Sequence, residues 1–238
     1  MGPQTEPLPP SALSESRSFT VRSRRERLLT AMAQVVAEDG YGAASVSKVV
    51  TAAGISRNSF YEHFANKEDC FLAAYDATVE QVLARVSVAT AATRSRRAAL
   101  EAGFAAFLGF AAEEPELAWL CVVEVLAAGP RALARRDEAM RRFALFLEET
   151  RGRGGPAVAP VLTEVVVGGI YEVIYARVLN RRTATLPELL PDVMYVWLAP
   201  FVGTTRATAV RAETARRLGY DGGRLLQVAP VHGRTGRT

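Results

Sequence analysis

The sequence is short of the residues from which most catalytic and metal sites are built. Its 238 residues include two cysteines and two histidines. The histidines, His63 and His232, lie far apart in the chain, so a histidine-based triad or a metal-ligand cluster has little material. A phosphate-binding loop and a dinucleotide-binding fingerprint are also missing. We therefore expect a protein that is not an enzyme and that holds no metal ion and no cofactor.

Long apolar runs are missing as well. No stretch approaches the roughly 20 apolar residues that a membrane-spanning helix needs. The N-terminus also lacks the basic-then-apolar pattern of a secretory signal. Cys70 and Cys121 lie within apolar helical patterns, which favours reduced core residues over a redox pair. These features predict a cytoplasmic protein with no membrane segment.

Charge gives no direct indication of a partner. The formal net charge is +4. Residues 1–205 hold 22 basic against 23 acidic side chains, whereas residues 206–238 hold 7 against 2. The positive excess therefore lies at the C-terminal end. Because net charge does not locate a nucleic-acid site, an argument for DNA binding has to rest on local motifs.

Helical periodicity, by contrast, is abundant. From about Arg24 onward apolar residues recur at spacings of three and four, as in Leu28 and Met32, and no alternating strand pattern is present. Glycine and proline mark the breaks between periodic segments. The sequence predicts an all-α fold with helices over residues 24–38, 46–53, 57–63, 67–92, 95–112, 116–127, 131–151, 158–181, 187–202 and 204–217.

Residues 45–56 have the pattern of a helix-turn-helix. Ser45 is a good N-cap for a first short helix, and Gly54 can adopt the left-handed conformation that ends it. Ile55 can anchor the turn in the core, and Ser56 can cap the second helix. Two short helices joined by such a glycine-bearing turn form a common DNA-binding unit.

The second helix of this unit has two different faces. At 100° per residue Phe60 and Phe64 share one face, which predicts core positions. Asn58 and Glu62 point the opposite way, on a short polar face that suits contacts with bases and phosphates. A helix with a purely structural role can be polar outside as well, so the periodicity leaves both interpretations open.

The particular residues in this region resemble the N-terminal signature of the TetR family of transcription regulators. The resemblance covers residues 24–72 and is carried by the segments Asp39-Gly40-Tyr41, Ala44-Ser45-Val46, Ala53-Gly54-Ile55-Ser56, Phe60-Tyr61-Glu62-His63-Phe64 and Asn66-Lys67-Glu68. The rest of the chain is similar to the family only in length, helix count and layout. The resemblance implies an N-terminal DNA-binding domain of three helices and a larger helical domain that binds a ligand and dimerises.

The resemblance also implies roles for individual residues. Arg57, Asn58 and Ser59 match positions that read bases, and Tyr61, His63 and Lys67 match positions that contact phosphates. The full set of expected DNA contacts is Ser47, Lys48, Ser56, Arg57, Asn58, Ser59, Tyr61, His63 and Lys67.

Several of these residues have a structural alternative. Ser56 can serve only as a helix cap, His63 can bridge two helices, and Tyr61 can pack its ring and offer only its hydroxyl. A carboxylate at Glu62 repels phosphate, and its favoured interpretation is an ion pair with a nearby arginine. The alternative is that Glu62 accepts a hydrogen bond from a cytosine amino group.

Aromatic residues gather in the middle of the chain, between residues 95 and 183. Helical spacing makes each of them a core residue first, but in a TetR-like protein the helices here surround a cavity. An apolar or aromatic effector suits such a lining. The expected ligand-binding residues are Phe104, Phe107, Trp119, Val123, Phe143, Tyr171 and Tyr175.

Glu124 interrupts an apolar stretch, where an unpaired carboxylate is costly to bury. The favoured interpretation is a structural ion pair with Arg131, Arg135 or Arg136, and the alternative is a polar contact with the ligand. Gly168 and Gly169 lie in an apolar stripe of the expected helix over 158–181, which indicates close backbone packing.

The helices over 158–181 and 187–202 match the paired helices of the family's four-helix dimer interface, although both can also be interior. The expected partners are double-stranded operator DNA, a small apolar or aromatic effector and a second copy of the chain. The expected function is a repressor released from a palindromic operator by the effector. The alternative is a ligand-independent DNA-binding regulator or an activator.

The expected division of the chain follows from these assignments. It has a disordered arm over 1–21, a DNA-binding domain over 22–68, a ligand-binding and dimerisation domain over 69–218 and a flexible tail over 219–238.

Overall fold

The computed structural model describes residues 10–151 and 160–219, and every regular element in these two stretches is a helix. The all-α prediction is confirmed. The α-helices are α1 (Pro10–Ala43), α2 (Val46–Ala53), α3 (Arg57–Tyr61), α4 (Lys67–Ala91), α5 (Arg96–Glu113), α6 (Pro115–Val122), α7 (Pro130–Arg151), α8 (Pro160–Leu179), α9 (Leu190–Val202) and α10 (Thr204–Arg217). Two 3-10 helices, η1 (Glu124–Leu126) and η2 (Thr183–Leu189), join α6 to α7 and α8 to α9.

The first helix begins earlier than its apolar pattern indicates. Helix α1 starts at Pro10 instead of near residue 24, so residues 10–21 are helical and not the expected disordered arm. The expected end of the helix is close to the observed one, because Gly40 has φ 79° and ψ 156° and breaks the helical geometry there. Residues 1–9 of the predicted arm and residues 220–238 of the predicted tail lie outside the described residues.

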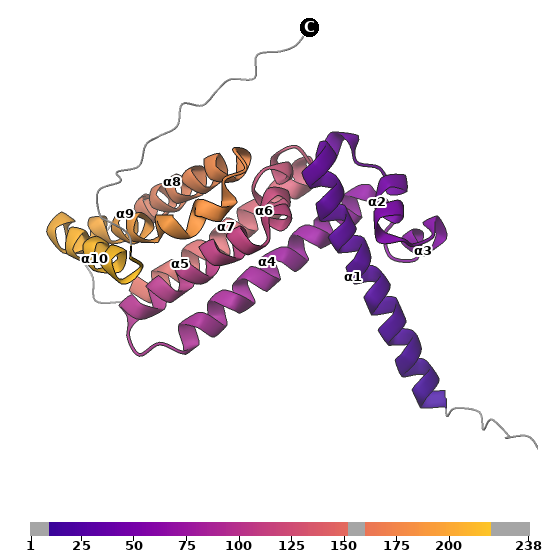
Figure 1. Cartoon of the computed structure of the whole chain (residues 1–238), viewed down its shortest axis with the longest axis horizontal. Coiled ribbons are helices and arrows are strands. Elements are labelled where there is room, and N and C mark those ends of the chain that lie inside the picture. Colours follow the sequence, from indigo (N-terminus) through magenta and orange to yellow (C-terminus); the bar gives the residue numbers. More distant parts are fainter. Residues whose placement is uncertain (1–9, 152–159, 220–238) are drawn as a thin grey trace, which may run out of the picture.

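The helices form two groups at opposite ends of the molecule. Figure 1 shows α1, α2 and α3 gathered at one end, with the N-terminal part of α1 projecting away from the body. Helix α4 leaves this group and runs beside α5 along the larger group, which α9 and α10 close at the far end. The chain therefore places a small helical unit on a long helix that also belongs to the larger one.

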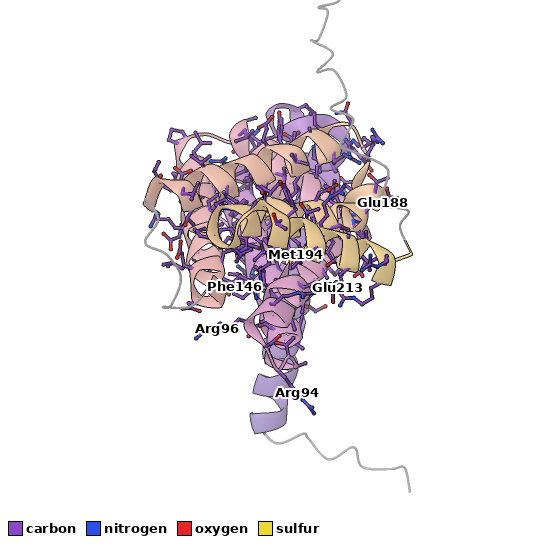
Figure 2. The ribbon with its side chains drawn as sticks, turned by 90° about the vertical axis from the view of Figure 1, so that its left-hand side faces the viewer. Arg94, Arg96, Phe146, Glu188, Met194 and Glu213 are labelled. Carbon is purple, nitrogen blue, oxygen red and sulfur yellow. The ribbon has the colours of Figure 1, made fainter. Side chains whose placement is uncertain are left out.

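Each group has its own apolar core. The first contains the fully buried Leu28, Met32 and Phe60, and it continues into α6 through Leu120. The second is built around Met194, which lies inside the α9–α10 end in Figure 2. Because the first core includes side chains from α6 and α7, the two groups share a packed boundary and not only a linker.

Within the described stretches, no single helix is both long and apolar enough to cross a membrane. One pair, Pro115–Leu126 with Pro130–Glu149, meets the length and composition criteria together but is bent by 119°.

Candidate DNA-binding surface and ligand pocket

The helix-turn-helix is present where the sequence predicts it. The Ser45 hydroxyl accepts a hydrogen bond from the Lys48 amide at 3.3 Å and caps α2. Gly54 ends α2 in the left-handed conformation, with φ 61° and ψ 41°. The Ser56 hydroxyl accepts from the Ser59 amide at 3.1 Å and caps α3. The two helix starts and the turn between them are therefore set by residues that the sequence identifies.

The two faces of α3 are also as predicted. Phe60 and Phe64 are 0% and 5% exposed, which confirms both as core residues. Arg57 and Asn58 are exposed, and Tyr61 is 48% exposed. The Arg57 guanidinium lies over the Tyr61 ring at 5.8 Å and donates to its hydroxyl at 3.4 Å. The expected contact residues that face solvent are Ser47, Lys48, Ser56, Arg57, Asn58 and Tyr61.

Ser59 lies on the inner edge of α3 and not on its exposed face. The residue is 6% exposed, and its hydroxyl donates to Glu62 Oε2 at 3.3 Å. This contact also answers the question about Glu62. The predicted ion pair with an arginine is wrong, because in the part of the chain that the structure describes Glu62 bonds to Ser59 and forms no ion pair.

The two lysines hold the end of α1 in place. Lys67 Nζ donates to the Tyr41 and Ala44 carbonyls at 3.0 Å each and lies 4.5 Å from the centre of the Tyr41 ring. Lys48 Nζ donates to the Ala43 carbonyl at 3.1 Å and pairs with Asp39 at 2.9 Å. Two of the three N–H groups of Lys67 are therefore used within the fold, which leaves less of this ammonium for the predicted phosphate contact.

His63 has a structural environment. Its ring is half-buried beside Phe64, with 6.2 Å between ring centres. Among the described residues its Nε2 has no hydrogen-bond partner. The bridging role and the phosphate contact therefore both stay predictions.

A cavity of about 120 Å³ lies between α4, α5, α6, α7 and α8. Four of the expected ligand-binding residues line it: Phe104, Phe107, Phe143 and Tyr171. Helix α4 contributes a face that sequence reasoning missed, with Tyr75, Thr78 and Val82 at spacings of three and four. This spacing carries the signal for the face, but the expected ligand-binding residues all lie beyond α4 in the chain.

Arg136 is the one charged side chain among the residues that line this cavity. Its guanidinium lies over the Tyr171 ring at 4.4 Å. One of its terminal nitrogens pairs with the exposed Asp137 at 3.1 Å. Its Nε is buried and has no partner among the described residues.

Trp119, Val123 and Tyr175 do not line the cavity, contrary to expectation. The Trp119 indole N–H donates to Glu124 Oε1 at 2.9 Å. The other oxygen of this carboxylate, 8% exposed as a residue, accepts from the Tyr41 amide at 2.6 Å. The Arg181 guanidinium lies 3.5 Å from the centre of the Trp119 ring and donates to the Ala37 carbonyl at 2.6 Å. We call Tyr41, Trp119, Glu124 and Arg181 the buried junction after the buried carboxylate at its centre; Tyr41 and Trp119 are half-buried, and Arg181 is exposed.

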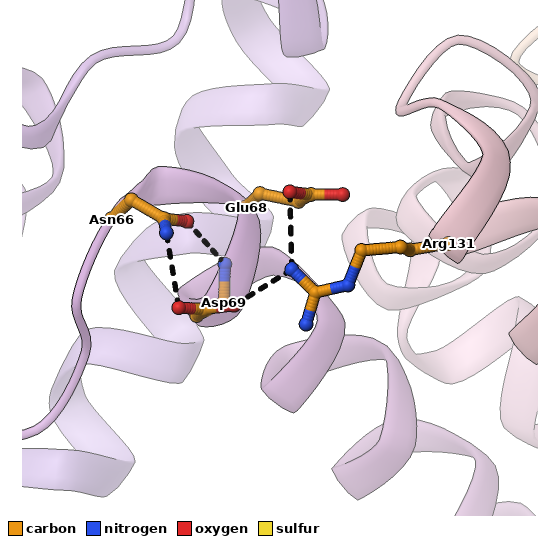
Figure 3. Close-up of polar contacts among 4 residues, drawn as sticks. All are labelled: Asn66, Glu68, Asp69 and Arg131. Atoms are coloured by element: carbon orange, nitrogen blue, oxygen red, sulfur yellow. Dashed lines mark hydrogen bonds and ion pairs between the residues drawn. The ribbon is translucent and has the colours of Figure 1, made fainter.

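The predicted pairing of Glu124 with an arginine of α7 is therefore wrong. Arg131 instead reaches the start of α4, where it pairs with Glu68 at 3.1 Å and Asp69 at 3.0 Å (Figure 3). Asp69 is held in turn by Asn66, whose side chain caps α4 (Figure 3).

Two more ion pairs follow along the same two helices. Arg135 pairs with Asp76 at 3.4 Å, and Arg142 pairs with Glu80 at 2.7 Å. The pairs advance in the same order on both helices, so α4 and α7 run in the same direction. We call these contacts, together with those of Arg131, the α4–α7 ladder.

Both cysteines are free thiols in the interior. Burial raises the pKa of Cys70 to about 12 and that of Cys121 to about 12. Both thiols are therefore protonated at neutral pH, which agrees with the predicted reduced core residues.

A sequence model described as “Bacterial regulatory proteins, tetR family” matches residues 28–74, which contain most of the first core and the whole helix-turn-helix. The N-terminal segment of this chain is therefore similar to that of TetR-family regulators. A TetR-family relative, the HTH-type transcriptional activator FasR of Mycolicibacterium smegmatis, is 33% identical over 87 residues. This match spans 37% of the chain and 40% of the relative, well under two thirds of that protein's length.

Solved TetR-family structures share the fold over most of the chain. The fatty acid degradation regulator FadR from Bacillus halodurans has a TM-score of 0.67 at 20% identity, covering 74% of this chain and 94% of that one. FadR from Bacillus subtilis in complex with stearoyl-CoA has a TM-score of 0.64 at 19% identity, covering 75% and 98%. Identities this low show the fold alone. All three proteins are regulators and not enzymes.

Proposed function

We propose that the protein is a homodimeric transcription regulator that binds a two-fold symmetric operator and responds to an acyl ligand in its pocket. The observation that carries the DNA half is the exposed polar face of α3. Arg57 and Asn58 extend from a short helix whose orientation is fixed by the buried Phe60 and Phe64. Such a rigidly held polar helix suits the major groove, where side-chain donors and acceptors can distinguish base pairs.

The observation that carries the ligand half is the cavity itself. It is lined almost throughout by apolar side chains, among them the rings of Phe107 and Phe143, which pack edge to face at 4.8 Å between centres and form part of its wall. The name of the B. halodurans FadR refers to fatty acid degradation, and the B. subtilis FadR structure contains stearoyl-CoA. An acyl chain is the ligand that fits both the lining and these relatives.

Pairing of two chains is supported by α8. Val161 and Val165 are 57% and 63% exposed on one face of this helix. Gly168 and Gly169 continue the face, and a Cβ added at either would meet nothing within 4 Å. An exposed apolar stripe with small residues suits a second helix packed closely against it. Val196 and Val202 of α9 are also 38% and 39% exposed.

A second candidate function is transcriptional activation. It is favoured by the match to FasR, which is named an activator. A ligand changes the affinity for DNA only if it binds the DNA-binding state and the other state with different affinity. The two functions therefore differ in which state the ligand favours: it lowers the affinity for DNA of a repressor and raises that of an activator of this kind. In either case the protein acts on the bacterial chromosome, and we infer a cytoplasmic location.

A gel shift with the DNA upstream of its own gene tests the DNA half. We expect a palindromic site with half-sites separated by about one helical turn, roughly 34–36 Å. Asn58→Ala should lower the preference for this site over random DNA by about tenfold, since a lost base contact removes about 1–3 kcal/mol of discrimination. Asn180→Ala, an exposed asparagine at the end of α8, is the matched control and should bind as the wild type does. Equal loss on specific and random DNA would remove the assigned role of Asn58.

Stearoyl-CoA added to the same gel shift tests the ligand half. Release of the operator supports a repressor, and tighter binding supports a regulator that acts with its ligand. A complex that does not change, together with no detectable binding of stearoyl-CoA or free fatty acids by calorimetry, would overturn the ligand half and leave the DNA half intact.

A further inference from the structure

The cavity has a polar end and an apolar end. Helices α4 and α7 run in the same direction, as the ladder shows. On α4 the lining hydroxyls of Tyr75 and Thr78 precede Val82, and on α7 the charged Arg136 precedes Phe143. The polar lining residues therefore lie at the same end of both helices, toward the DNA-binding domain.

The neighbouring helices contribute to the same polarity. Tyr171 of α8 lies under the Arg136 guanidinium, and its hydroxyl donates to the Val122 carbonyl at 2.9 Å. Cys121 of α6 lines the cavity at this end and is hydrogen-bonded to Thr78. From Arg136 to Leu147, the last lining residue of α7, eleven residues of helix span about 16 Å. The cavity is thus an apolar tunnel with one polar end.

Arg136 lacks one acceptor at this polar end. An arginine is always charged and offers five N–H donors. The guanidinium bonds Asp137, and it contacts Tyr171 both through the ring and by a side-chain hydrogen bond, but the buried Nε has no partner among the described residues. A buried donor without an acceptor is unfavourable, and a ligand oxygen placed there relieves that cost.

We propose that the ligand is a linear amphiphile whose anionic head binds Arg136 and whose tail runs along the paired rings of Phe107 and Phe143 toward Leu147. This inference rests on the proposed function that the pocket takes an acyl ligand, and it assigns the orientation of that ligand and the residue that selects its head. Arg136 is a specificity-determining residue. It favours a ligand with an anionic oxygen over a neutral ligand of the same chain length.

The orientation places the head near the buried junction. Tyr171 contacts the head-binding arginine and also bonds Val122, which ends α6 two residues before Glu124. A change in the position of Arg136 or Tyr171 on binding is therefore transmitted to α6 through one hydrogen bond. A ligand bound with its head at the other end would have no such contact.

Isothermal titration calorimetry with three probes of equal chain length tests the proposal. The probes are dodecanoate, dodecanoyl-CoA and dodecanol, and the proteins are the full-length wild type, Arg136→Gln, Arg136→Lys and Arg135→Gln. Arg135 is the matched control, because it precedes Arg136 on α7 but pairs with Asp76 and does not line the cavity. Thermal unfolding of each variant checks that it is folded.

We expect the wild type to bind at least one anionic probe more tightly than dodecanol. Arg136→Gln should weaken that binding about 10- to 100-fold, as expected for the loss of a charge-assisted hydrogen bond, and leave dodecanol unchanged. Arg136→Lys should retain part of the affinity for the anionic probe. Arg135→Gln should bind that probe as tightly as the wild type does. Loss confined to dodecanoate identifies a carboxylate head, and loss confined to dodecanoyl-CoA identifies a coenzyme A phosphate; either supports the proposal.

Two outcomes contradict different parts of the argument. If the wild type binds an anionic probe and Arg136→Gln binds it equally well, or if dodecanol binds the wild type as tightly as both anions, the role of Arg136 is overturned while the acyl-ligand function stands. If none of the three probes binds the wild type, the proposed acyl-ligand function itself fails, and the assignment of Arg136 fails with it.

Discussion

Two sets of contacts with different physical character lie between the DNA-binding helices and the pocket: one ties the end of α1 to α6, and the other ties α4, which leads from the DNA-binding helices along the pocket, to α7. In the buried junction one carboxylate, 8% exposed, takes hydrogen bonds from an indole and a backbone amide. In the α4–α7 ladder the arginine side chains are 40–58% exposed and pair with carboxylates across water-accessible surface. The first set fixes the position of α6 against the end of α1. The second aligns two helices and can rearrange at little cost.

This difference indicates how the two domains can move relative to one another. Leaving a buried carboxylate or its donors unpaired is expensive, so the buried junction either holds or breaks as a unit. Exposed ion pairs contribute little to the free energy of unfolding and are screened by salt. The side chains of the ladder can therefore change partners as α4 and α7 move past one another. A ligand-driven shift of α4 is therefore more compatible with rearrangement of the ladder than with opening of the junction.

The largest effect is expected from Glu124→Ala. It leaves the Tyr41 amide and the Trp119 indole N–H without an acceptor, and the free energy of unfolding should fall by about 3 kcal/mol. Urea unfolding followed by circular dichroism measures it. Glu124→Gln keeps one acceptor oxygen, so its free energy of unfolding should fall by less than that of Glu124→Ala. A loss under about 1 kcal/mol for Glu124→Ala would mean that the junction is not the stronger of the two contacts.

Trp119→Phe should have the next largest effect. The substitution removes the indole donor and part of the ring on which Arg181 stacks, and we expect a loss of about 1–2 kcal/mol. A double-mutant cycle with Glu124→Gln isolates the contact between the two side chains. A coupling energy of about 1 kcal/mol is expected, and additive losses would show that the two residues act independently.

The ladder carboxylates should respond to pH with opposite signs. The hydrogen bond from Arg142 lowers the pKa of Glu80, so Glu80 adds stability above its unfolded-state pKa and loses it as the pH falls through the folded value. Burial raises the pKa of Asp76 despite Arg135, so its contribution is present at low pH and is lost as the pH rises through the folded value.

Urea midpoints at pH 3 and pH 7 measure these two contributions. Relative to the wild type, Glu80→Gln should be less stable at pH 7 than at pH 3, and Asp76→Asn should be relatively more stable at pH 7 than at pH 3. The same pH trend for both variants would contradict the opposite signs.

The smallest effect is expected from Arg131→Ala. The side chain is 58% exposed, and both its pairs are open to solvent. The urea midpoint should fall slightly at low ionic strength and match the wild type in 0.5 M salt, where the screening length is well under 10 Å. A large loss of stability that persists at high salt would show that the ladder stabilises the fold as much as the buried junction does.

The sequence predicts the helix-turn-helix better than the pocket, and the reason is the range of the interactions. Ser45, Gly54 and Ser56 act on backbone groups within a few residues, so their roles can be identified locally. Trp119 and Glu124 act across the fold, and Glu124 bonds an amide 83 residues away. Periodicity shows that such residues are buried but not which element covers them.

Local reasoning also fails where one residue has two plausible partners. The arginines nearest to Glu124 in sequence, such as Arg131 and Arg135, are used by α4, whose acidic residues lie far from them in the chain. Helix α1 is the converse case. Its start at Pro10 has little apolar periodicity to indicate it, because a helix that projects from the body has no core to face.

The bond between the Tyr41 amide and Glu124 limits how freely the two domains can be exchanged between regulators. Gly40 lies directly against this carboxylate, and a side chain added there would approach its oxygens at 3.7 Å in an unfavourable backbone conformation. A chimera that joins this DNA-binding domain to another ligand-binding domain must therefore keep Gly40, a residue other than proline after it, and the pair Trp119 and Glu124. The joint between the two domains is therefore not confined to the end of α3 or the start of α4, because it includes this contact between two distant parts of the chain.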